Sequence, residues 1–412
     1  MLPQDVNDIV ISGLGVVSPF GIGLDALSGG LAAGRSCVKE ITAFDLSRCR
    51  ARVGAGFEGY EADQFDDSKT FGRTARCTQF AIISVSEALR RAAIDLDSID
   101  NTRVGLFLSS ARGAYEKTEK FYANLVEKGP RFVNPLLFQE SVNNAPAAHV
   151  SLHYGFTGPC LALTSGGVGT TQAMAMGRLW LMQNKLDYAL IVSTEALTQI
   201  SHEAYSHAHG HAPARLGGIH ESCPFDQRRN GFVFGEGAVT LVMERQTAAQ
   251  RRGVEAPVSV AGIGIAHDGY GVAKNDPHGS GIAMAMQQCL QVAGREADDV
   301  DWILAAANSS PVGDRAETRA IKRVFATAPP VTSLKSVYGE LEGAAVAMDV
   351  ASAMVAMSHN TLLPTINYQQ PDPECDLDYV ADGVRDGELN VVMLNGCSFG
   401  GGAGSVLLHK VD

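Results

Sequence analysis

The segment GPCLALTSGGVGTTQAMAMGRLW, residues 158–180, has the small residues that often precede a nucleophile at the start of a helix. Cys160, Thr164 and Ser165 carry thiol or hydroxyl groups just ahead of the apolar run. Such groups become strong nucleophiles beside a base or at a helix N-terminus. One interpretation is therefore an enzyme that hydrolyses or transfers an acyl thioester through Cys160 or Ser165. The alternative is that Cys160 is a buried, small apolar residue of a strand.

Histidine and cysteine side chains could also carry chemistry. Four histidines lie in SHAHGHAPARLGGIH, namely His207, His209, His211 and His220, but the remaining ligands of a closed metal site are not evident from the pattern. His149 and His153 are expected on a helix at an interface. The eight cysteines show no CxxC spacing, which indicates free thiols and neither a zinc site nor a disulfide framework. We therefore predict no metal.

Composition limits the classes of partner. The 412 residues carry 33 basic and 45 acidic side chains, a net charge of 33 − 45 = −12. This charge disfavours nucleic acid and anionic membranes as partners. The N-terminal residues MLPQDVNDIVISGLG do not resemble a signal peptide, and no apolar run reaches the ~20 residues of a membrane span. We expect a soluble, cytoplasmic protein.

The elements that would position these groups alternate between short β-branched runs and longer Ala-, Met- and Leu-rich segments, which predicts an α/β fold. The predicted strands are Asp8–Leu14, Val104–Ser109, Tyr188–Ser193, Ala238–Val242, Ser259–Ile265, Trp302–Ala306, Val391–Leu394 and Ser405–Leu408. The predicted helices are Cys77–Ala93, Val168–Gln183, Ile282–Ala293 and Gly343–Ser358.

The two halves of the chain resemble each other. IVISGLGVVSPFG is similar to SVAGIGIAHDGYG, RVGLFLSSARG to DWILAAANSSPVG, and DYALIVSTEA to LNVVMLNGCSFGG. The same order of motifs indicates a duplicated unit. The charged, Pro-ended stretch Arg245–Pro257 marks the boundary, which predicts domains 1–250 and 251–412. The G-L-G and G-I-G pairs lack the third glycine of a dinucleotide fingerprint, so we expect them to allow close helix–sheet packing.

Longer motifs resemble one family. VISGLGVVSPFG, PFDQRRNGFVFGEGAVTLVME, PVGDRAETRAIKRVF, LKSVYGELEGAAVAMDVASA, LLPTINYQQPDPECDLDYV and NGCSFGGGAGSVLL are similar, over nearly the whole chain, to blocks of the β-ketoacyl synthases of the thiolase-like superfamily. The resemblance implies a thiolase-like fold, in which the duplicated halves form a layered αβαβα core. It also implies an active site with a nucleophilic cysteine at a helix N-terminus and two histidines that assist decarboxylation.

In this sequence those three positions hold other residues. Aligned from Gly158-Pro159, the family's cysteine falls on Gly167, and the first histidine falls on Ala306. The second histidine falls on Glu340, whose carboxylate we expect to pair with Lys335. Glycine cannot be acylated, so Glu340 as a catalytic base would have no nucleophile to serve. Other parts of the family site persist: Lys335, Asp349 in place of a glutamate, and the loop Phe399, Gly400, Gly401.

This combination resembles the chain-length factor, the non-catalytic partner of a type II polyketide ketosynthase. The resemblance implies a heterodimer with a catalytic ketosynthase, whose interface forms the tunnel for the acyl chain in an aromatic, polyene or fatty-acid-like pathway. It implies no cofactor of its own, the acyl chain being carried on the phosphopantetheine of an acyl carrier protein. Tunnel or interface positions fall on Arg112, Tyr115, Leu137 and Phe138. A module that only binds the carrier protein is disfavoured by the acidic charge.

Overall fold

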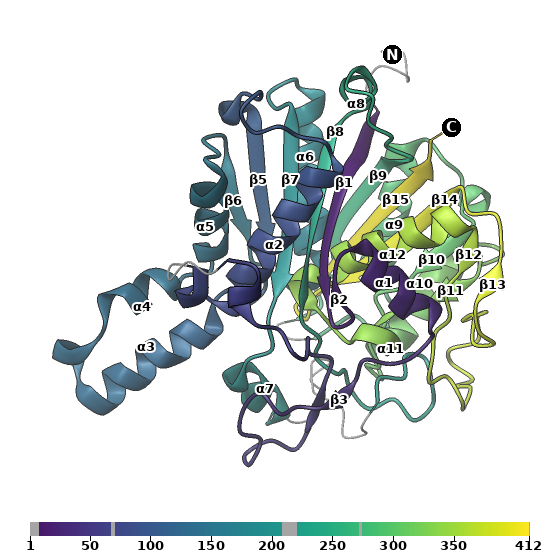
Figure 1. The fold of residues 1–412 in the computed structure, drawn as a ribbon. Helices are drawn as coiled ribbons and strands as arrows, with labels where there is room; N and C mark the ends of the chain where they lie inside the picture. Colours follow the sequence, from purple (N-terminus) through teal and green to yellow (C-terminus); the bar gives the residue numbers. More distant parts are fainter. Residues whose placement is uncertain (1–7, 67–70, 208–220, 272–273, 412) are drawn as a thin grey trace.

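The structure, a computed structural model, describes residues 8–66, 71–207, 221–271 and 274–411. Its centre is an eleven-stranded mixed sheet in the order β11-β10-β14-β15-β9-β1-β8-β7-β5-β6, with β2 beside β1 (Figure 1). Helices cover both faces of the sheet. The predicted α/β, thiolase-like class is confirmed.

The sheet strands are β1 Ile9–Ser18, β2 Gly21–Ile22, β5 Val104–Ser109, β6 Cys160–Leu163, β7 Tyr188–Glu195, β8 Gly237–Arg245, β9 Val258–His267, β10 Trp302–Leu304, β11 Val331–Thr332, β14 Val391–Cys397 and β15 Gly402–Lys410. Two short hairpins lie outside it, β3 Lys39–Glu40 with β4 Val53–Gly54, and β12 Thr361–Leu362 with β13 Arg385–Asp386.

The helices are α1 Leu24–Ala32, α2 Arg76–Arg91, α3 Tyr115–Lys128, α4 Pro135–Glu140, α5 Ala145–Tyr154, α6 Gly169–Met182, α7 Gln199–Ser206, α8 Gln246–Arg251, α9 Ser280–Ala293, α10 Gly313–Val324, α11 Lys335–Tyr338 and α12 Ala345–His359. Two 3-10 turns bear on the site: Gly166–Val168 precedes α6, and Glu342–Ala344 precedes α12.

Strand order is the same in the two halves of the sheet. From the centre outward it runs β1-β8-β7-β5-β6 on one side and β9-β15-β14-β10-β11 on the other. The similar sequence motifs occupy equivalent strands, β1 with β9, β5 with β10 and β7 with β14. The halves meet where β1 pairs antiparallel with β9, at Val10 and Ser259. A domain boundary at residue 250 stays a prediction.

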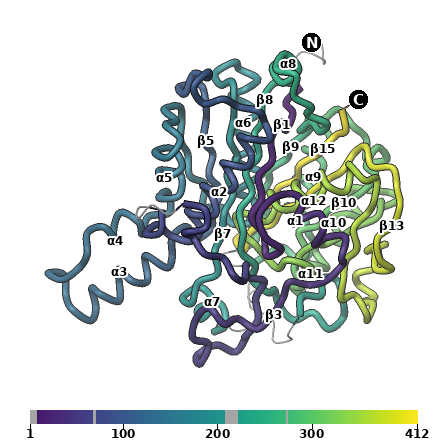
Figure 2. Tube along the Cα trace, in the orientation of Figure 1, coloured from purple at the N-terminus to yellow at the C-terminus, as the bar shows by residue number. Residues whose placement is uncertain are grey.

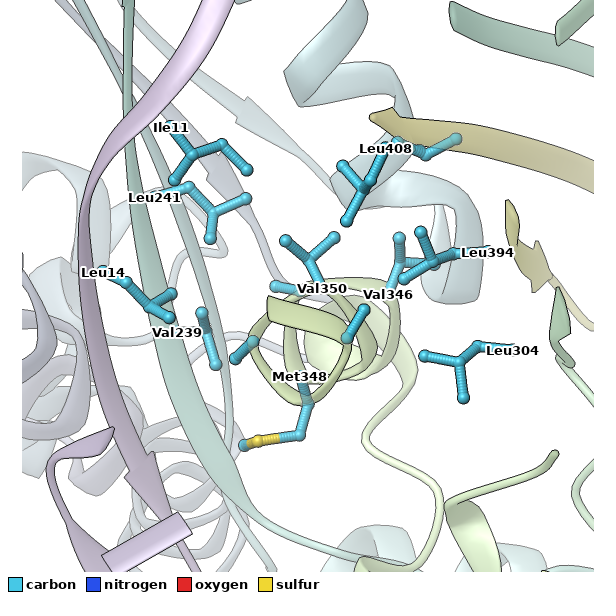
Figure 3. Close-up of a cluster of buried hydrophobic side chains, with 14 of the residues drawn as sticks. Ile11, Leu14, Val239, Leu241, Leu304, Val346, Met348, Val350, Leu394 and Leu408 are labelled. Atoms are coloured by element: carbon cyan, nitrogen blue, oxygen red, sulfur yellow. The ribbon is translucent and has the colours of Figure 1, made fainter. Parts of the chain in front are cut away.

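Helix α12 forms the apolar centre between the halves. Figure 3 shows its Val346, Met348 and Val350 among side chains from β1, β8, β10, β14 and β15. The helix is rich in alanine and is buried around most of its circumference. Residues that are apolar all round favour a helix enclosed on every side, as here.

Glycines let the outer helices approach the central strands. A Cβ on Gly15 would lie 1.9 Å from the carbonyl oxygen of Ser84 in α2, and one on Gly264 would lie 1.9 Å from that of Ala285 in α9. Both distances are far below van der Waals contact, so a side chain would push each helix off the sheet. The predicted packing role of these glycines is confirmed. Strand β1 was predicted to end at Leu14, but it continues through Gly15 to Ser18.

The ends of some predicted strands were wrong. The strand predicted to reach Ala306 ends at Leu304, because the N–H of Ala306 donates to the Glu317 carboxylate (2.9 Å) and not to a neighbouring strand. Residues 115–142, where the periodicity predicted no helix, form an arm built from α3 and α4 that projects from the body (Figure 2).

Candidate functional site

Gly167 lies in the 3-10 turn ahead of α6, as expected for the family's nucleophile position. A Cβ at Gly167 would lie 2.1 Å from the carbonyl oxygen of Cys397. The hydroxyl of Ser398 holds the two loops together, because it donates to the carbonyl of Ser165 and accepts from the N–H of Val168 (3.2 Å). Backbone therefore occupies the place where a nucleophilic side chain would begin.

The nearby thiol of Cys397 is a poor nucleophile. Burial raises the pKa of Cys397 well above its ordinary value, and the negative charge of Glu317 adds to the shift. The thiolate is the reactive form, so a raised pKa removes reactivity near neutral pH.

Cys160 and Ser165 do not form a catalytic pair. Cys160 lies on β6, the edge strand that leads into the turn, as the sequence predicted, but the residue is exposed where burial was expected. Partial burial raises the pKa of Cys160. In the described residues no histidine is hydrogen bonded to Cys160 or Ser165.

Glu340 bonds to other groups than the one we expected. Its carboxylate accepts from the side-chain amide of Asn308 (2.8 Å) and from the N–H of Glu342 (2.8 Å). The expected ion pair with Lys335 is wrong: the Lys335 ammonium pairs with Asp349 (3.2 Å) and lies beyond ion-pair distance of Glu340. Burial raises the pKa of Glu340, while the charge of Lys335 acts against that rise.

Lys335 is instead paired with Asp349. The ammonium lies 3.2 Å from the Asp349 carboxylate and also donates to the carbonyl of Ala305 (3.3 Å). The second oxygen of Asp349 accepts from the hydroxyl of Tyr338 (2.5 Å). Burial alone would lower the pKa of Lys335, but Asp349 and the neighbouring carboxylates raise it above its ordinary value. Lys335 is therefore a charged, fully buried residue.

The Phe399 loop closes over this region. Phe399 stacks on Phe232, with 5.2 Å between the ring centroids, and lies 5.9 Å from Tyr205. Gly401 has a φ of +90°, and a Cβ there would lie 2.1 Å from the Asp268 carboxylate, so glycine is required. A Cβ on Gly400 would meet nothing within 4 Å.

The cavity beside these residues is small. It measures about 40 Å³ and is lined by Ala306, Asn308, Glu317, Cys397 and Phe399, among others. That volume suits a few water molecules and not an acyl chain. A larger hollow of about 660 Å³ opens between the β3–β4 hairpin, the base of α3 and the start of α7, and none of the family positions lines it.

Glu317, a member of this site that the sequence analysis missed, is a buried acid without a counter-ion at hydrogen-bond distance. One carboxylate oxygen accepts from the N–H of Ala306 and from the amide of Asn395 (3.0 Å), and the other has no partner among the described residues. Burial raises its pKa from an ordinary 4.5 to about 7. Its place three residues after Asp314 in α10, on the buried side of the helix, was the available sequence signal.

We expect stability to depend on pH through Glu317. Because its folded-state pKa lies above the unfolded value, the stabilisation is complete below about pH 4.5 and is lost as pH rises through about 7. Glu317→Gln should therefore match the parent at pH 5 and gain roughly 3 kcal/mol at pH 8.5, from about 1.36 kcal/mol per pKa unit. Urea unfolding at both pH values tests this. Glu255→Gln, at an exposed site, is the control, and its stability should differ from that of the parent by the same amount at pH 5 and pH 8.5. Equal stability of Glu317→Gln and the parent at pH 8.5 would contradict the prediction.

A second buried cluster lies directly behind the Gly167 turn. Arg112, only 4% exposed, follows β5, and its Nε lies 3.1 Å from the Glu195 carboxylate and 2.9 Å from that of Glu342. Its guanidinium carbon stands 4.5 Å from the centroid of the Phe234 ring. Burial raises the pKa of Glu342 to about 7 although Arg112 opposes the shift.

The four predicted tunnel or interface residues do not come together. Arg112 lies inside the molecule, Tyr115 begins α3 at the base of the arm, and Leu137 and Phe138 lie on α4 at a distance from the body (Figure 1). Phe138 is 57% exposed. Of the predicted histidines, His149 pairs with Glu140 of the arm (2.5 Å), whereas His209, His211 and His220 fall outside the described residues.

In the described ranges, His, Cys, Asp and Glu side chains form no group of three that would hold a metal ion. Nor does any helix in those ranges have the length and apolar content needed to cross a bilayer. All eight cysteines are free, as predicted.

Comparison with known proteins identifies the family. Residues 6–249 match the family "Beta-ketoacyl synthase, N-terminal domain", and residues 258–369 match "Beta-ketoacyl synthase, C-terminal domain". The chain is 31% identical over 407 residues to 3-oxoacyl-(acyl-carrier-protein) synthase 2 of Coxiella burnetii, which covers 98% of both chains. It is 32% identical over 413 residues to the putative polyketide beta-ketoacyl synthase 1 of Streptomyces halstedii, with 97% of both covered.

The fold also matches solved structures. One is the ishigamide ketosynthase/chain length factor, with a TM-score of 0.90, 24% identity, and coverage of 99% of this chain and 100% of that chain. Because two domain families and relatives above 30% identity span nearly the whole sequence, this chain belongs to the β-ketoacyl synthase family.

Proposed function

We propose that this chain is a non-catalytic, chain-length-factor-type subunit that pairs with a catalytic ketosynthase and shapes the tunnel for a growing acyl chain in type II polyketide biosynthesis. The observation that carries the proposal is the contact at Gly167. The family's nucleophile position has no thiol, and the backbone of Cys397 leaves no space for a side chain. The two relatives above are named as synthases, and this chain departs from the family's pattern at all three catalytic positions.

The other two positions support the proposal. Ala306 has no ionisable side chain, and Glu340 is held by Asn308 and the backbone of Glu342. A general acid or base must reach the reacting group by a hydrogen bond, and both oxygens of Glu340 already have partners. The cavity of about 40 Å³ gives an acyl chain no place beside them.

An exposed apolar surface is available for the partner. Strand β6 ends the sheet and, in the described part of the chain, pairs only with β5. Beside this edge lie α5, with Leu152 80% exposed, and the arm of residues 115–142. The arm exposes Tyr122, Val126, Phe132, Leu136 and Phe138. An uncovered strand edge next to apolar side chains is costly in a free monomer and typical of an interface.

The partner would supply the chemistry. In this proposal the acyl chain arrives on the phosphopantetheine of an acyl carrier protein, is transferred to the cysteine of the ketosynthase, and extends along the shared interface. The present chain contributes tunnel wall and no cofactor, and acts with its partner in the cytoplasm. The ishigamide match, whose name pairs a ketosynthase with a chain length factor, supports this at the level of the fold.

Acylation tests the proposal directly. The purified chain, a ketosynthase encoded beside it, and the two together are each incubated with acyl-loaded and malonyl-loaded carrier protein, followed by intact-mass spectrometry of both chains. We expect the acyl group on the ketosynthase alone, and condensation only when both chains are present. Acyl transfer to this chain, at Cys160 or Ser165, would instead establish the thioester-processing enzyme.

Pairing should depend on the arm and α5. Phe138→Asp and Leu152→Asp each place a charge on an exposed apolar site, and we expect each to weaken binding to the ketosynthase at least about tenfold. Sedimentation velocity at several concentrations measures this. Val292→Asp is the control, because Val292 is 51% exposed but lies on α9 in the other half of the molecule. Equal affinity of all three variants would exclude this surface as the interface.

A further inference from the structure

The cavity of about 40 Å³ beside the former catalytic positions contains buried acceptors without donors. Glu317, only 1% exposed, and Asn275 both line it, and Glu317 Oε2 and Asn275 Oδ1 have no hydrogen-bond partner in the described part of the chain. Asn308 also lines the cavity. Its side-chain nitrogen donates to Glu340, and no described residue donates to its side-chain oxygen. Leaving a buried acceptor unsatisfied is costly, so a positively charged or hydrogen-bond-donating group is expected there.

The buried acids around the cavity outnumber the bases that pair with them. Lys335 is paired with Asp349 (3.2 Å), and Arg229 lies 3.7 Å from Asp314. Among the described residues no basic side chain lies within ion-pair distance of Glu317, whose other oxygen accepts only from amide groups. A buried anion without a counter-charge is unstable. The cavity next to Glu317 is the place where a counter-charge has room.

The available oxygen atoms suit a singly charged cation. Asp268, Asp276 and Asp314 line the same cavity, but each carboxylate already accepts at least two backbone N–H groups. The remaining ligands are one carboxylate oxygen of Glu317 and uncharged amide oxygens. Calcium and transition metals bind to several carboxylates or to His and Cys, and the described residues contain no such group. Potassium, by contrast, binds to uncharged oxygens.

We infer that this cavity binds one alkali-metal cation, such as K⁺, through Glu317 Oε2 and the amide oxygens of Asn275 and Asn308. The site goes beyond the proposed function and does not depend on it. An ion close to the size of a water molecule fits the volume of about 40 Å³. The cation supplies the counter-charge that Glu317 lacks. It also joins α10, which carries Glu317, to the chain segment at Asn275.

The test probe is thallium(I), which takes the place of K⁺ and is located by its anomalous X-ray scattering. Crystals of the full chain, grown with choline chloride and no alkali-metal salt, are soaked in thallium(I) acetate at pH 8.5. We expect an anomalous peak in the cavity beside the Glu317 carboxylate. Glu317→Gln keeps the shape of the side chain but removes its charge, and should lose the peak. No peak in the parent, or an equal peak in folded Glu317→Gln, would overturn the inference.

Glu244→Gln is the matched control. Glu244 is also a fully buried acid with one unpartnered oxygen, but it does not line this cavity. The variant should keep the peak at full strength. Ordered water in the cavity of the parent crystal, without an anomalous peak, would show that water satisfies these acceptors and would count against the cation. All of these outcomes leave the proposed pairing with a ketosynthase untouched, because the chain is studied alone.

Unfolding in solution excludes an ion that binds only at the concentration of the soak. About 100 mM KCl, compared with the same concentration of choline chloride, should raise the urea midpoint of the parent at pH 8.5 by roughly 0.3 to 0.5 M, the shift for a ligand at about ten times its Kd. Glu317→Gln should show no shift between the two salts. The gain predicted above for Glu317→Gln at that pH therefore applies to the choline buffer. Equal midpoints of the parent in the two salts would refute the site.

Discussion

Lys335→Met should lower the free energy of unfolding by about 3 to 5 kcal/mol, the usual cost of removing one partner from a buried ion pair. Lys335 is 3% exposed and Asp349 1%, so no water replaces the lost ammonium. Glu340 and Glu317 also lie close enough to interact with its positive charge. In the variant, less positive charge would offset the cost of burying their carboxylates. The carboxylates of Asp349, Glu340 and Glu317 would all be less stable as buried anions. Urea unfolding at pH 7 gives the measurement.

Two control variants test whether the loss of stability comes from the buried ion pair. Lys335→Met/Asp349→Leu removes both members of the pair and should recover most of the lost stability, because no uncompensated charge remains. Lys39→Met breaks an exposed pair with Glu58 and should leave the unfolding midpoint within error. A Lys335→Met protein as stable as the parent would show that water reaches this site.

The regular elements were accessible from the sequence because their signals are local. The strand Val104–Ser109 was predicted with the bounds observed, and the predicted helix Val168–Gln183 differs from α6 by one residue at each end. The β-branched run predicts a strand and the long apolar segment predicts a helix, each from its own residues. The vestigial positions were accessible for a different reason, namely a family resemblance, and the Gly167 turn lies where that resemblance places it.

The side-chain partners were not accessible, because they depend on which distant loops meet. Glu340 was assigned to Lys335 because a buried lysine needs an anionic partner. Asn308, thirty-two residues away in the chain, bonds to Glu340 instead. The cluster of Arg112, Glu195 and Glu342 draws on three segments with no shared motif. At Gly167 the backbone of Cys397 leaves no room for a side chain, and this contact could not be predicted from the sequence alone.

Gly167→Cys should fail to create a synthase and should also destabilise the protein by about 3 kcal/mol or more, since overpacking against backbone cannot be relieved by a side-chain rotation. The added Cβ would lie 2.1 Å from the Cys397 carbonyl oxygen and 3.0 Å from its carbon. Even Gly167→Cys/Ala306→His/Glu340→His, which restores all three side chains, should not become acylated. Intact-mass analysis after incubation with acyl carrier protein, together with urea unfolding, tests both parts.

Gly400→Cys is the matched control, since a Cβ there meets no atom within 4 Å and the residue lies on the Phe399 loop of the same site. It should unfold at nearly the same urea concentration as the parent. The comparison separates two reasons for inactivity. A stable Gly167→Cys protein that takes up an acyl group would mean that only the missing thiol keeps this chain from being acylated. A destabilised, unreactive variant beside a stable Gly400→Cys would mean that the scaffold around the nucleophile position has itself closed, and that catalysis cannot be regained by restoring side chains alone.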